Sequence, residues 1–311
     1  MRDGAILPSI QSPSGALPAR FRRPRLLIVG CGDIGMRVVR QLHRRLQLTV
    51  LKPSDRRADA LRAMGVRVLR GDLDVAPSLS RFAGLADRVL HLAPPPAQGW
   101  FDLRTRSLVR SLRLRGSVRS LLYVSTSGVY GDCAGKVASE TRPPRADTPR
   151  ARRRLDAESQ LRVYGRSTRV RVSILRAAGI YAQDRDGGSA RRRLLAGTPM
   201  LRRQDDVFTN HIHADDLARA CVVGLWRARA QRVYNVNDDS QLRLGDYFDL
   251  AADRYGLPRP PRIARSAAQA ALPLGLLGFT QESRRLDNGR LERELRLRLR
   301  YPTVADGLCG A

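Results

Sequence analysis

The first residues whose types and spacing suggest chemistry are three glycines near the start of the chain. Gly30, Gly32 and Gly35 form a G-x-G-x-x-G pattern that directly follows the apolar run 26–29. In this context the first glycine allows a tight turn, the second lets a diphosphate approach the backbone, and the third lets a helix pack on a strand. Free amides at the start of that helix then face the phosphates. We therefore predict a dinucleotide site made of Gly30, Cys31, Gly32, Asp33, Ile34 and Gly35.

The residues about 20 positions after the first glycine decide which ribose such a site accepts. Sites for NAD(H) carry Asp or Glu there, which binds the 2′-hydroxyl. Here Lys52 follows the apolar run 48–51 without an acid, and Ser54, Arg56 and Arg57 come next. Cations and a hydroxyl suit a 2′-phosphate. We predict a preference for NADP(H), with NAD(H) as the alternative cofactor, while ordinary solvated arginines are the other explanation of this segment.

The elements that must position these residues are short apolar runs alternating with segments of helical spacing. Strands are expected at 26–29, 48–51, 66–69, 89–93, 121–125, 170–175 and 233–236. Helices are expected at 34–46, 58–64, 103–114, 150–163, 214–227, 243–255 and 266–277. Such alternation predicts βαβ units and a parallel sheet buried on both faces. The predicted fold class is α/β, a Rossmann-type doubly wound sheet with a small mixed C-terminal lobe.

The chain is expected to fall into three parts. Residues 1–24 hold four prolines among Ser, Gly and Arg, and this composition predicts a flexible leader. Residues 25–176 are predicted to form an NAD(P)-binding Rossmann domain. Residues 177–311 are predicted to form a smaller substrate-side lobe that completes the same fold.

Composition limits the classes of function that remain. The net charge is +28, and of the 57 Lys and Arg residues only Lys52 and Lys136 are lysine. Because the arginines are spread along the chain, specific nucleic-acid binding is kept only as a remote alternative. No apolar run approaches the roughly 20 residues of a membrane span, so no membrane partner is expected. The 4 cysteines form no C-x-x-C pair, which favours a cytoplasmic protein.

Three later segments carry a second set of motifs. They are STSGVYG at 125–131, LRAAGIY at 175–181 and HIHADDLA at 211–218. Together with the glycine pattern they resemble the short-chain dehydrogenase/reductase superfamily, specifically its extended and atypical NAD-dependent epimerase/dehydratase branch. The resemblance runs from about Leu26 to Leu308.

The resemblance implies roles for single residues. Asp72 and Leu73 match the segment that lines the adenine ring, and Leu92 and Ala93 match the strand end on the nicotinamide side. The catalytic Ser/Thr position of the family falls on Thr126. Its hydroxyl either binds a substrate oxygen or caps its own backbone.

The chain departs from the resembling family at the acid/base. The family has P-Y-x-x-x-K with an acid four residues further on; here the proline and the acid are in place, but Tyr becomes Arg150 and Lys becomes Arg154. The usual proton donor is therefore missing, because arginine stays protonated. Arg154 is expected to donate to ribose hydroxyls, and Arg150 to neutralise an anionic substrate or a developing alkoxide. Arg152 and Arg153 are expected on a solvated helix face.

Two interpretations of function remain. In the first, the protein is an NADP(H)-dependent oxidoreductase or sugar-nucleotide-modifying enzyme whose proton comes from Tyr130, Tyr181, His91 or a water. In the second, it binds NADP(H) without turnover, as a redox sensor or scaffold. A small anionic or sugar-like substrate is expected, because arginines at 191–193 and 202–203 occupy the segment that contacts substrate in the family. A charged surface is the alternative explanation, and it applies to most of these five arginines.

The remaining expectations concern metals and subunits. His211 and His213 are two residues apart, but no third ligand is in view, so no metal site is expected. Many members of the resembling family form homodimers through helices equivalent to 103–114 and 150–163, and a homodimer is the expected assembly.

Overall fold

The structure is a computed structural model, and it describes residues 23–55, 57–185 and 190–308. Its centre is a seven-stranded sheet in the order β11-β7-β5-β4-β1-β2-β3, and every strand pair in it is parallel. This confirms the predicted fold class. The strands are β1 Arg25–Val29, β2 Gln47–Lys52, β3 Arg67–Arg70, β4 Arg88–His91, β5 Ser120–Thr126, β7 Arg171–Ala177 and β11 Arg232–Val236. Apart from Arg23 and Pro24, the predicted leader lies outside the described residues.

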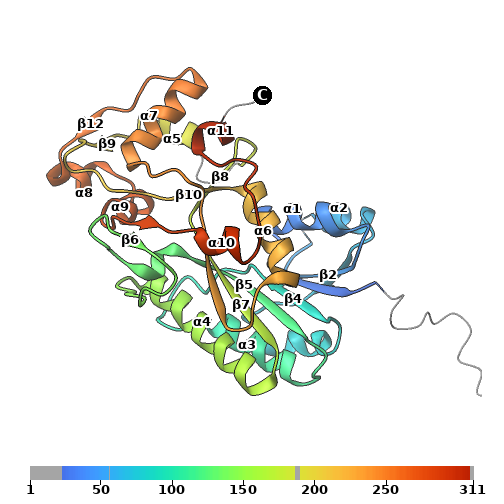
Figure 1. Cartoon of the computed structure of the whole chain (residues 1–311). Coiled ribbons are helices and arrows are strands. Elements are labelled where there is room, and N and C mark those ends of the chain that lie inside the picture. Colours follow the sequence, from blue (N-terminus) through green and yellow to red (C-terminus); the bar gives the residue numbers. More distant parts are fainter. Residues whose placement is uncertain (1–22, 56, 186–189, 309–311) are drawn as a thin grey trace, which may run out of the picture.

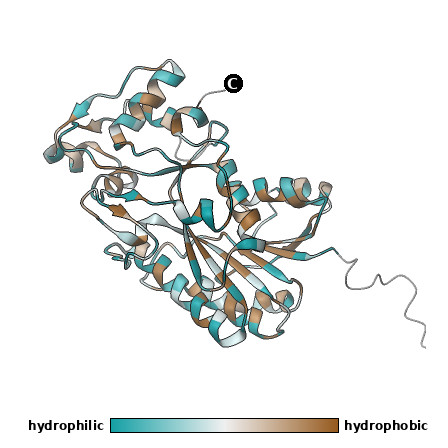
Figure 2. Cartoon of the chain, in the orientation of Figure 1, coloured by the Kyte–Doolittle hydropathy of each residue, from teal (hydrophilic) through white to brown (hydrophobic). Residues whose placement is uncertain are grey.

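Helices cover both faces of this sheet (Figure 1). On one face lie α1 Asp33–Leu42, α2 Ala58–Ala63 and α6 Ala214–Arg227; on the other lie α3 Leu103–Arg113, α4 Pro149–Thr168 and the 3₁₀ turn η2 Ala76–Phe82. Leu26 and Ile28 of β1 are buried against the first group. Leu27 and Val29 are buried against the second. Strands buried on both faces are continuously apolar, as Figure 2 shows for the brown central strands.

The order of the strands reverses at β1. The chain runs outward from β1 through β2 to β3, and then crosses back to place β4 on the other side of β1. In a parallel sheet this reversal leaves a crevice at the carboxyl ends of β1 and β4, where ligands bind in open α/β folds. The glycine pattern lies at the carboxyl end of β1, so it opens into this crevice.

A smaller mixed lobe with its own buried cluster lies above the carboxyl ends of the strands (upper left in Figure 1). Its helices are α5 Ala190–Leu195, α7 Leu244–Tyr255, α8 Ala268–Ala271, α9 Leu274–Thr280 and α11 Val304–Leu308. Helix α10 Gly289–Arg293 instead packs beside β11, and its Leu291 belongs to a buried cluster of the central sheet. Three short parallel pairs lie outside the central sheet: β8 Gly179–Tyr181 with β10 His211–His213, β9 Met200–Leu201 with β12 Arg262–Ile263, and β6 Val137–Ala138 with β13 Arg285–Leu286. The β9–β12 pair lies within the lobe, and the β6–β13 pair joins the later part of the chain to the earlier one. The later part of the chain, after residue 177, also contributes strand β11 to the central sheet and helix α6 to one of its faces.

Two predicted helices differ from the observed ones. The helix expected at 266–277 is divided into the 3₁₀ turn η4 Arg265–Ala267, α8 and α9, because Pro273 cannot continue a helix and instead precedes α9. The helix expected at 34–46 ends at Leu42, although Leu46 is still buried from the following turn. No helix in the described part of the chain combines the length and hydropathy that crossing a membrane requires.

Candidate functional site

The glycine turn has the geometry of a cradle for a diphosphate. Gly30 has a φ of +88°, and a Cβ there would lie 2.5 Å from the backbone nitrogen of Ala93. Gly32 has a φ of −82°, and a Cβ there would meet nothing within 4 Å. A Cβ on Gly35 would lie 3.1 Å from the Cys31 sulfur, where α1 packs closely on the turn. The turn is therefore tight at the first glycine and open at the second, so the residues present fit a dinucleotide.

Residues from the ends of β2, β3 and β4 surround this turn. Leu92 and Ala93 both donate their amides to the carbonyl oxygen of Val29, at 2.8 and 3.0 Å, so they lie beside the end of β1. On the other side, the Gly71 amide donates to the Lys52 carbonyl oxygen at 3.0 Å. This bond brings the next residues, Asp72 and Leu73, to the end of β2; Leu73 is buried and the Asp72 amide donates to a serine hydroxyl.

The positive charges of Lys52 and Arg57, at and after the end of β2, affect the electrostatics of the glycine turn. Burial raises the pKa of the Cys31 thiol to about 11, and Lys52 and Arg57 oppose this rise. Lys52 is buried at the strand end, whereas Arg57 is exposed and precedes α2 with a φ of 63°. Arg56, the other predicted cofactor residue in this segment, lies outside the described residues.

Thr126 ends β5, one strand beyond β4. Its hydroxyl oxygen accepts a hydrogen bond from the Gly128 amide at 3.2 Å, which is the backbone-capping contact weighed for this residue. The side chain is half-buried, and a hydroxyl oxygen that accepts one bond can still donate its own proton to a ligand. The neighbouring Ser125 hydroxyl is buried and has no hydrogen-bond partner among the described residues.

Arg154 and Arg150 occupy the first turns of α4, which begins with Thr148 capping the Ala151 amide at 3.2 Å. Arg154 reaches back to β5, where its Nη1 donates to the Tyr123 hydroxyl and to the Val124 carbonyl oxygen, both at 3.0 Å. Arg150 lies at the surface and has no hydrogen-bond or ion-pair partner in the described part of the chain. Neighbouring atoms that shield its guanidinium from water, together with Arg154 and Arg153, lower its pKa.

Comparison with known families agrees with this geometry. Residues 26–237 match the model of the "NAD dependent epimerase/dehydratase family". The chain belongs to this family. The match confirms the resemblance found in the sequence, and it identifies an NAD(P)-binding protein of a family of NAD-dependent enzymes.

Solved structures of similar fold cover almost the whole chain. A conserved protein of unknown function from Silicibacter pomeroyi is 26% identical, with a TM-score of 0.77 over 92% of this chain and 96% of that one. UDP-glucose 4-epimerase from Thermotoga maritima is 19% identical, with a TM-score of 0.75 over 91% and 96%. A dTDP-glucose 4,6-dehydratase from Streptomyces venezuelae, solved with NAD, is 24% identical, with a TM-score of 0.75 over 91% and 94%. A search of curated proteins finds no match.

Arg152 and Arg153 lie between the two altered positions of the frame, and only one of them is exposed to solvent. Arg152 is exposed and stacks 4.8 Å from the centre of the Trp100 ring. Arg153 is only 7% exposed and donates to the Gly99 carbonyl oxygen at 2.6 Å. The prediction of a solvated Arg153 is wrong, because the loop that ends at Asp102 folds over this side of α4.

The three side chains considered as alternative proton donors are buried. His91 lies 2.9 Å from the Thr105 hydroxyl through Nε2, and burial, aided by Arg154, lowers its pKa to about 3. The Tyr130 hydroxyl donates to Asn235 at 2.8 Å, and the Tyr181 hydroxyl donates to the Thr303 carbonyl oxygen at 3.1 Å. Burial raises the pKa of both tyrosines. None of the three holds a proton that is free for an incoming substrate.

The acid that completes the family frame, Glu158, forms a buried ion pair that the sequence analysis did not identify. Arg176 of β7 donates to both of its carboxylate oxygens, at 3.1 and 2.7 Å, and both side chains are at most 3% exposed. The Arg176 guanidinium also lies 4.7 Å from the centre of the Tyr130 ring. The signal available in the sequence was Arg176, which is a charge inside the otherwise apolar run 174–178.

The other candidate residues lie in the smaller lobe. Of the arginines at 191–193 and 202–203, only Arg193 is half-buried, and burial lowers its pKa against the opposing effect of Tyr247. His211 stacks on Tyr247 with ring centres 4.1 Å apart, and the His213 Nδ1 accepts from the amide at the start of α6. The described residues contain no group of three His, Cys, Asp or Glu side chains that could hold a metal.

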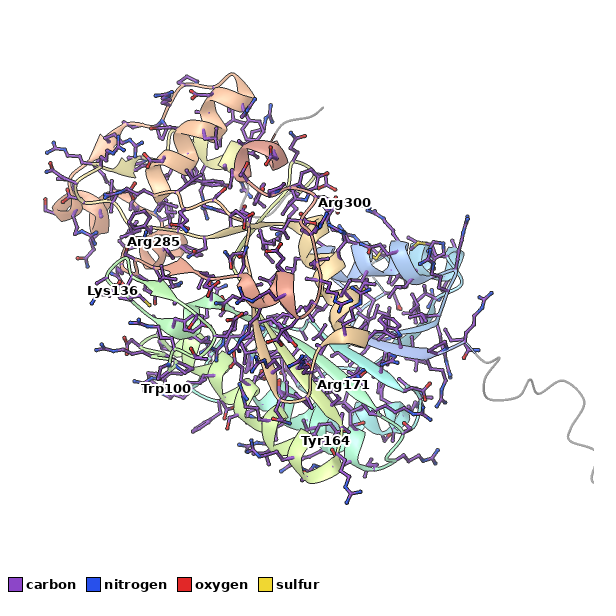
Figure 3. The ribbon with its side chains drawn as sticks, viewed as in Figure 1. Trp100, Lys136, Tyr164, Arg171, Arg285 and Arg300 are labelled. Carbon is purple, nitrogen blue, oxygen red and sulfur yellow. The ribbon has the colours of Figure 1, made fainter. Side chains whose placement is uncertain are left out.

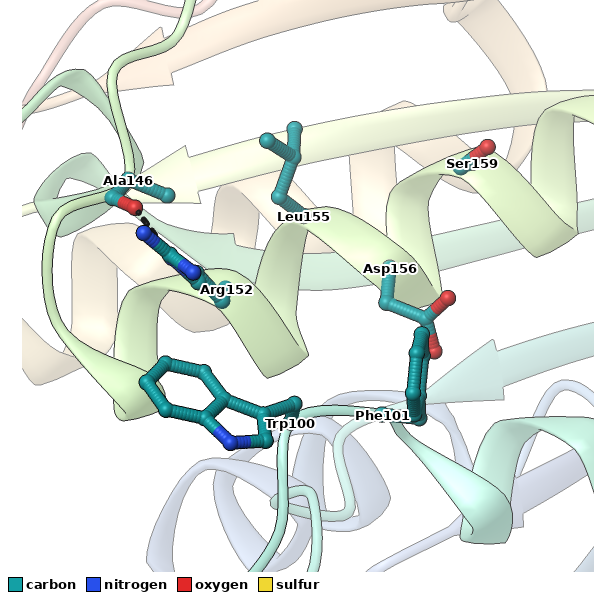
Figure 4. A pocket seen from close by; sticks show the side chains of 7 residues that line it. All are labelled: Trp100, Phe101, Ala146, Arg152, Leu155, Asp156 and Ser159. Carbon is teal, nitrogen blue, oxygen red and sulfur yellow. Dashed lines mark hydrogen bonds between the residues drawn. The ribbon is translucent and has the colours of Figure 1, made fainter.

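A hollow of about 620 Å³ lies on the outer face of α4 (Figure 4). It is lined by Trp100, Phe101, Ala146, Arg152, Leu155, Asp156 and Ser159. The α4 residues in this set are spaced by three or four, so they form the stripe that points away from the sheet. Since Arg154 points toward β5, this hollow is separate from the glycine turn.

Proposed function

We propose that this protein is an NADP(H)-dependent enzyme that reduces a carbonyl group of a small anionic or sugar-like substrate, with Arg150 and Arg154 in place of the usual Tyr and Lys. The observation that carries the proposal is the state of Arg150. It stands in the acid/base position of the frame, it has no acidic partner among the described residues, and shielding from water, together with Arg154 and Arg153, lowers its pKa. An unpaired guanidinium of this kind supports binding of negative charge.

The cofactor would lie across the glycine turn. The pyrophosphate would face the residues at 30–35, the adenosine would face Lys52, Arg56, Asp72 and Leu73, and the nicotinamide side would face Leu92, Ala93, Thr126 and Arg154. When bound, NADPH supplies a hydride. Lys52 and Arg57 both act electrostatically on the turn, which supports the preference for NADP(H) over NAD(H).

The available side chains favour reduction over oxidation. When hydride adds to a carbonyl carbon, the C=O π electrons move to the oxygen, and Arg150 would stabilise the resulting alkoxide. A water then gives its proton to that oxygen and leaves as hydroxide. Oxidation of an alcohol needs a base instead, and a guanidinium cannot serve as one, while the His91 imidazole is buried. Epimerisation through a keto intermediate needs both directions, so this site is less suited to it.

The proposed substrate class rests on the similar structures and on one arginine of the smaller lobe. Two of the solved structures of similar fold are named for sugar-nucleotide substrates. On the smaller lobe, the half-buried Arg193 has no hydrogen bond or ion pair among the described residues. Arginine forks suit a diphosphate or a carboxylate, so a sugar nucleotide or a sugar acid fits best.

An assay of NADPH oxidation against sugar nucleotides, keto sugars and aldehydes tests the proposal. We expect turnover with an anionic carbonyl substrate, and at least a tenfold loss of kcat in Arg150→Ala because the alkoxide loses its partner. Arg152→Ala, on the exposed side of the same helix turn, is the matched control and should keep its rate. No turnover with any carbonyl substrate, despite tight NADP(H) binding, would favour the second candidate, a redox sensor or scaffold.

The remaining partners are also proposals. We infer a homodimer formed through α3 and α4, because the side chains of Trp100, Phe101, Leu103 and Val163 on or beside these helices are about half exposed. We propose a cytoplasmic location and no specific nucleic-acid partner. The division into a cofactor-binding domain at 25–176 and a substrate-side lobe at 177–311 likewise stays a prediction.

A further inference from the structure

A cluster of charged side chains joins the glycine turn to the smaller lobe. Its members are Asp33 and Arg37 of α1, Asp184 and Arg185 after β8, and Asp215 of α6. Arg37 is 7% exposed; its Nε donates to Asp33 at 3.0 Å, and its two Nη groups donate to Asp184 and Asp215. All three donor nitrogens of Arg37 are therefore used within the cluster.

Arg185 is held differently. Its Nη1 donates to the Ile180 carbonyl oxygen at 3.1 Å, and its Nε lies 3.1 Å from the second carboxylate oxygen of Asp33. That oxygen is buried and accepts no hydrogen bond from any described residue, so the contact is an ion pair of poor hydrogen-bond geometry. The Nη2 of Arg185 has no partner among the described residues, and the side chain is 21% exposed.

The position of Asp33 creates an electrostatic difficulty for a dinucleotide. Asp33 is the first residue of α1, directly after the open Gly32 where a pyrophosphate would lie. A carboxylate there repels the phosphates and competes with them for the helix N-terminus. Arg37 cannot turn toward the phosphates without leaving its three acids. Arg185, by contrast, still has its Nη2 without a partner among the described residues, and it contacts the same Asp33 carboxylate.

We propose that Arg185 is a pyrophosphate-binding residue, supplied to the glycine turn by the smaller lobe and positioned by Asp33. Its Nη2 donates to a phosphate oxygen of the bound dinucleotide, while its Nε stays on Asp33 and its Nη1 stays on the Ile180 carbonyl. The arrangement makes cofactor binding depend on the turn that follows β8. This inference rests on the proposed binding of NADP(H).

A double-mutant cycle on dinucleotide binding tests the proposal. We expect Arg185→Ala to weaken NADPH binding about tenfold to hundredfold, measured by calorimetry or fluorescence. If Arg185 acted only by neutralising Asp33, the double variant Asp33→Asn/Arg185→Ala would bind NADPH as tightly as Asp33→Asn. If Arg185 contacts the phosphate, the double variant stays at least tenfold weaker than Asp33→Asn. Equal affinities of these two variants would overturn the proposal.

A second test uses a ligand that has no pyrophosphate. Adenosine 2′-monophosphate should bind wild type and Arg185→Ala equally, and an equal loss for both ligands would also contradict the proposal. Arg259→Ala, which removes an arginine from an exposed ion pair with Asp253, is the control for loss of charge alone. Thermal unfolding of each variant separates a loss of folding from a loss of binding. A wild-type protein that binds neither NADPH nor NADH would instead contradict the proposed function itself.

Discussion

At the scale of single residues, the site depends on two glycines that are needed for different reasons. Gly30 is required by the fold, since its φ is positive and the end of β4 leaves no room for a Cβ. Gly32 has a negative φ of −82° and open space around it, so neither a left-handed backbone nor a close neighbour requires glycine there. The lack of a side chain at Gly32 matters only when a ligand, such as a dinucleotide, approaches the turn from solvent.

This difference predicts opposite behaviour of two alanine variants. Gly30→Ala should lower the free energy of unfolding by about 3 kcal/mol, because it combines backbone strain with overpacking. Gly32→Ala should unfold at the wild-type denaturant midpoint but bind NADPH at least tenfold more weakly. Chemical unfolding and ligand titration measure the two effects. Unchanged NADPH affinity in a folded Gly32→Ala would place the pyrophosphate elsewhere.

The choice of cofactor is predicted to depend on Arg57, the described and exposed cation after β2. Arg57→Ala should weaken NADPH binding roughly tenfold to hundredfold, because a charged hydrogen bond to the 2′-phosphate is lost. NADH has no such phosphate, so its affinity should stay the same. Arg62→Ala, which removes an arginine of α2 paired with Asp59, is the matched control. A variant that loses both cofactors equally would contradict a role in 2′-phosphate binding.

A buried carboxyl group predicts the pH dependence of stability. Asp238 is 1% exposed, and burial raises its pKa to about 8. The unfolded chain loses this proton near pH 4 while the folded one keeps it to about pH 8, so the stability falls as pH rises between these values. Asp238→Asn should flatten the decline, by at most about 1.4 kcal/mol per pH unit. Urea unfolding at pH 5 and pH 8 measures it, and Glu292→Gln, at an exposed acid of α10, should keep the wild-type slope.

At the scale of elements, α4 carries the departure from the family and is fixed in place from two sides. The buried Glu158–Arg176 pair ties its middle to β7, and Arg154 ties its first turns to β5. The helix backbone therefore keeps the place that the family frame implies, although its two catalytic residue types have changed. Among the described residues, Arg150 is the member of the frame without a hydrogen-bond or ion-pair partner.

Breaking the buried pair should destabilise the whole fold. Glu158→Gln leaves the Arg176 guanidinium buried without its counter-charge, which costs about 3–5 kcal/mol. Chemical unfolding measures the loss of stability. Asp253→Asn, which breaks an exposed ion pair with Arg259, should change the unfolding midpoint little. A similarly small effect of Glu158→Gln would mean that the pair has little influence on stability.

The sequence predicted the large elements because their signal is local. The seven strands of the sheet and the helices between them have apolar runs or helical spacing, and the structure confirms them within a few residues. The two- and three-residue pairs such as β8 with β10 were missed because such short strands are defined by partners about 30 residues away. The burial of Arg153 was missed for the same reason, since a distant loop covers it. The contact between Arg185 and Asp33 also joins segments far apart in the sequence.

At the scale of the whole molecule, the charge of +28 is distributed rather than gathered. Blue-tipped side chains surround both lobes in Figure 3, and many of the arginines are paired with acids or backbone carbonyls. The contrasting surface is the apolar stripe beside the hollow on α4, where Trp100 and Phe101 are more than half exposed. A protein surrounded by like charge associates with itself only where such a patch offsets the repulsion.

This contrast predicts a dimer that is sensitive to charge placed on α3 and α4. At micromolar concentration we expect sedimentation or light scattering to give twice the monomer mass of 34.6 kDa. Phe101→Asp combined with Val163→Asp should give monomers, because each change buries an unpaired carboxylate in the interface. Leu195→Asp, at an apolar position equally exposed on the smaller lobe, should leave the dimer intact. If the wild type is a monomer, or if only Leu195→Asp dissociates it, the contact surface lies elsewhere than on α4.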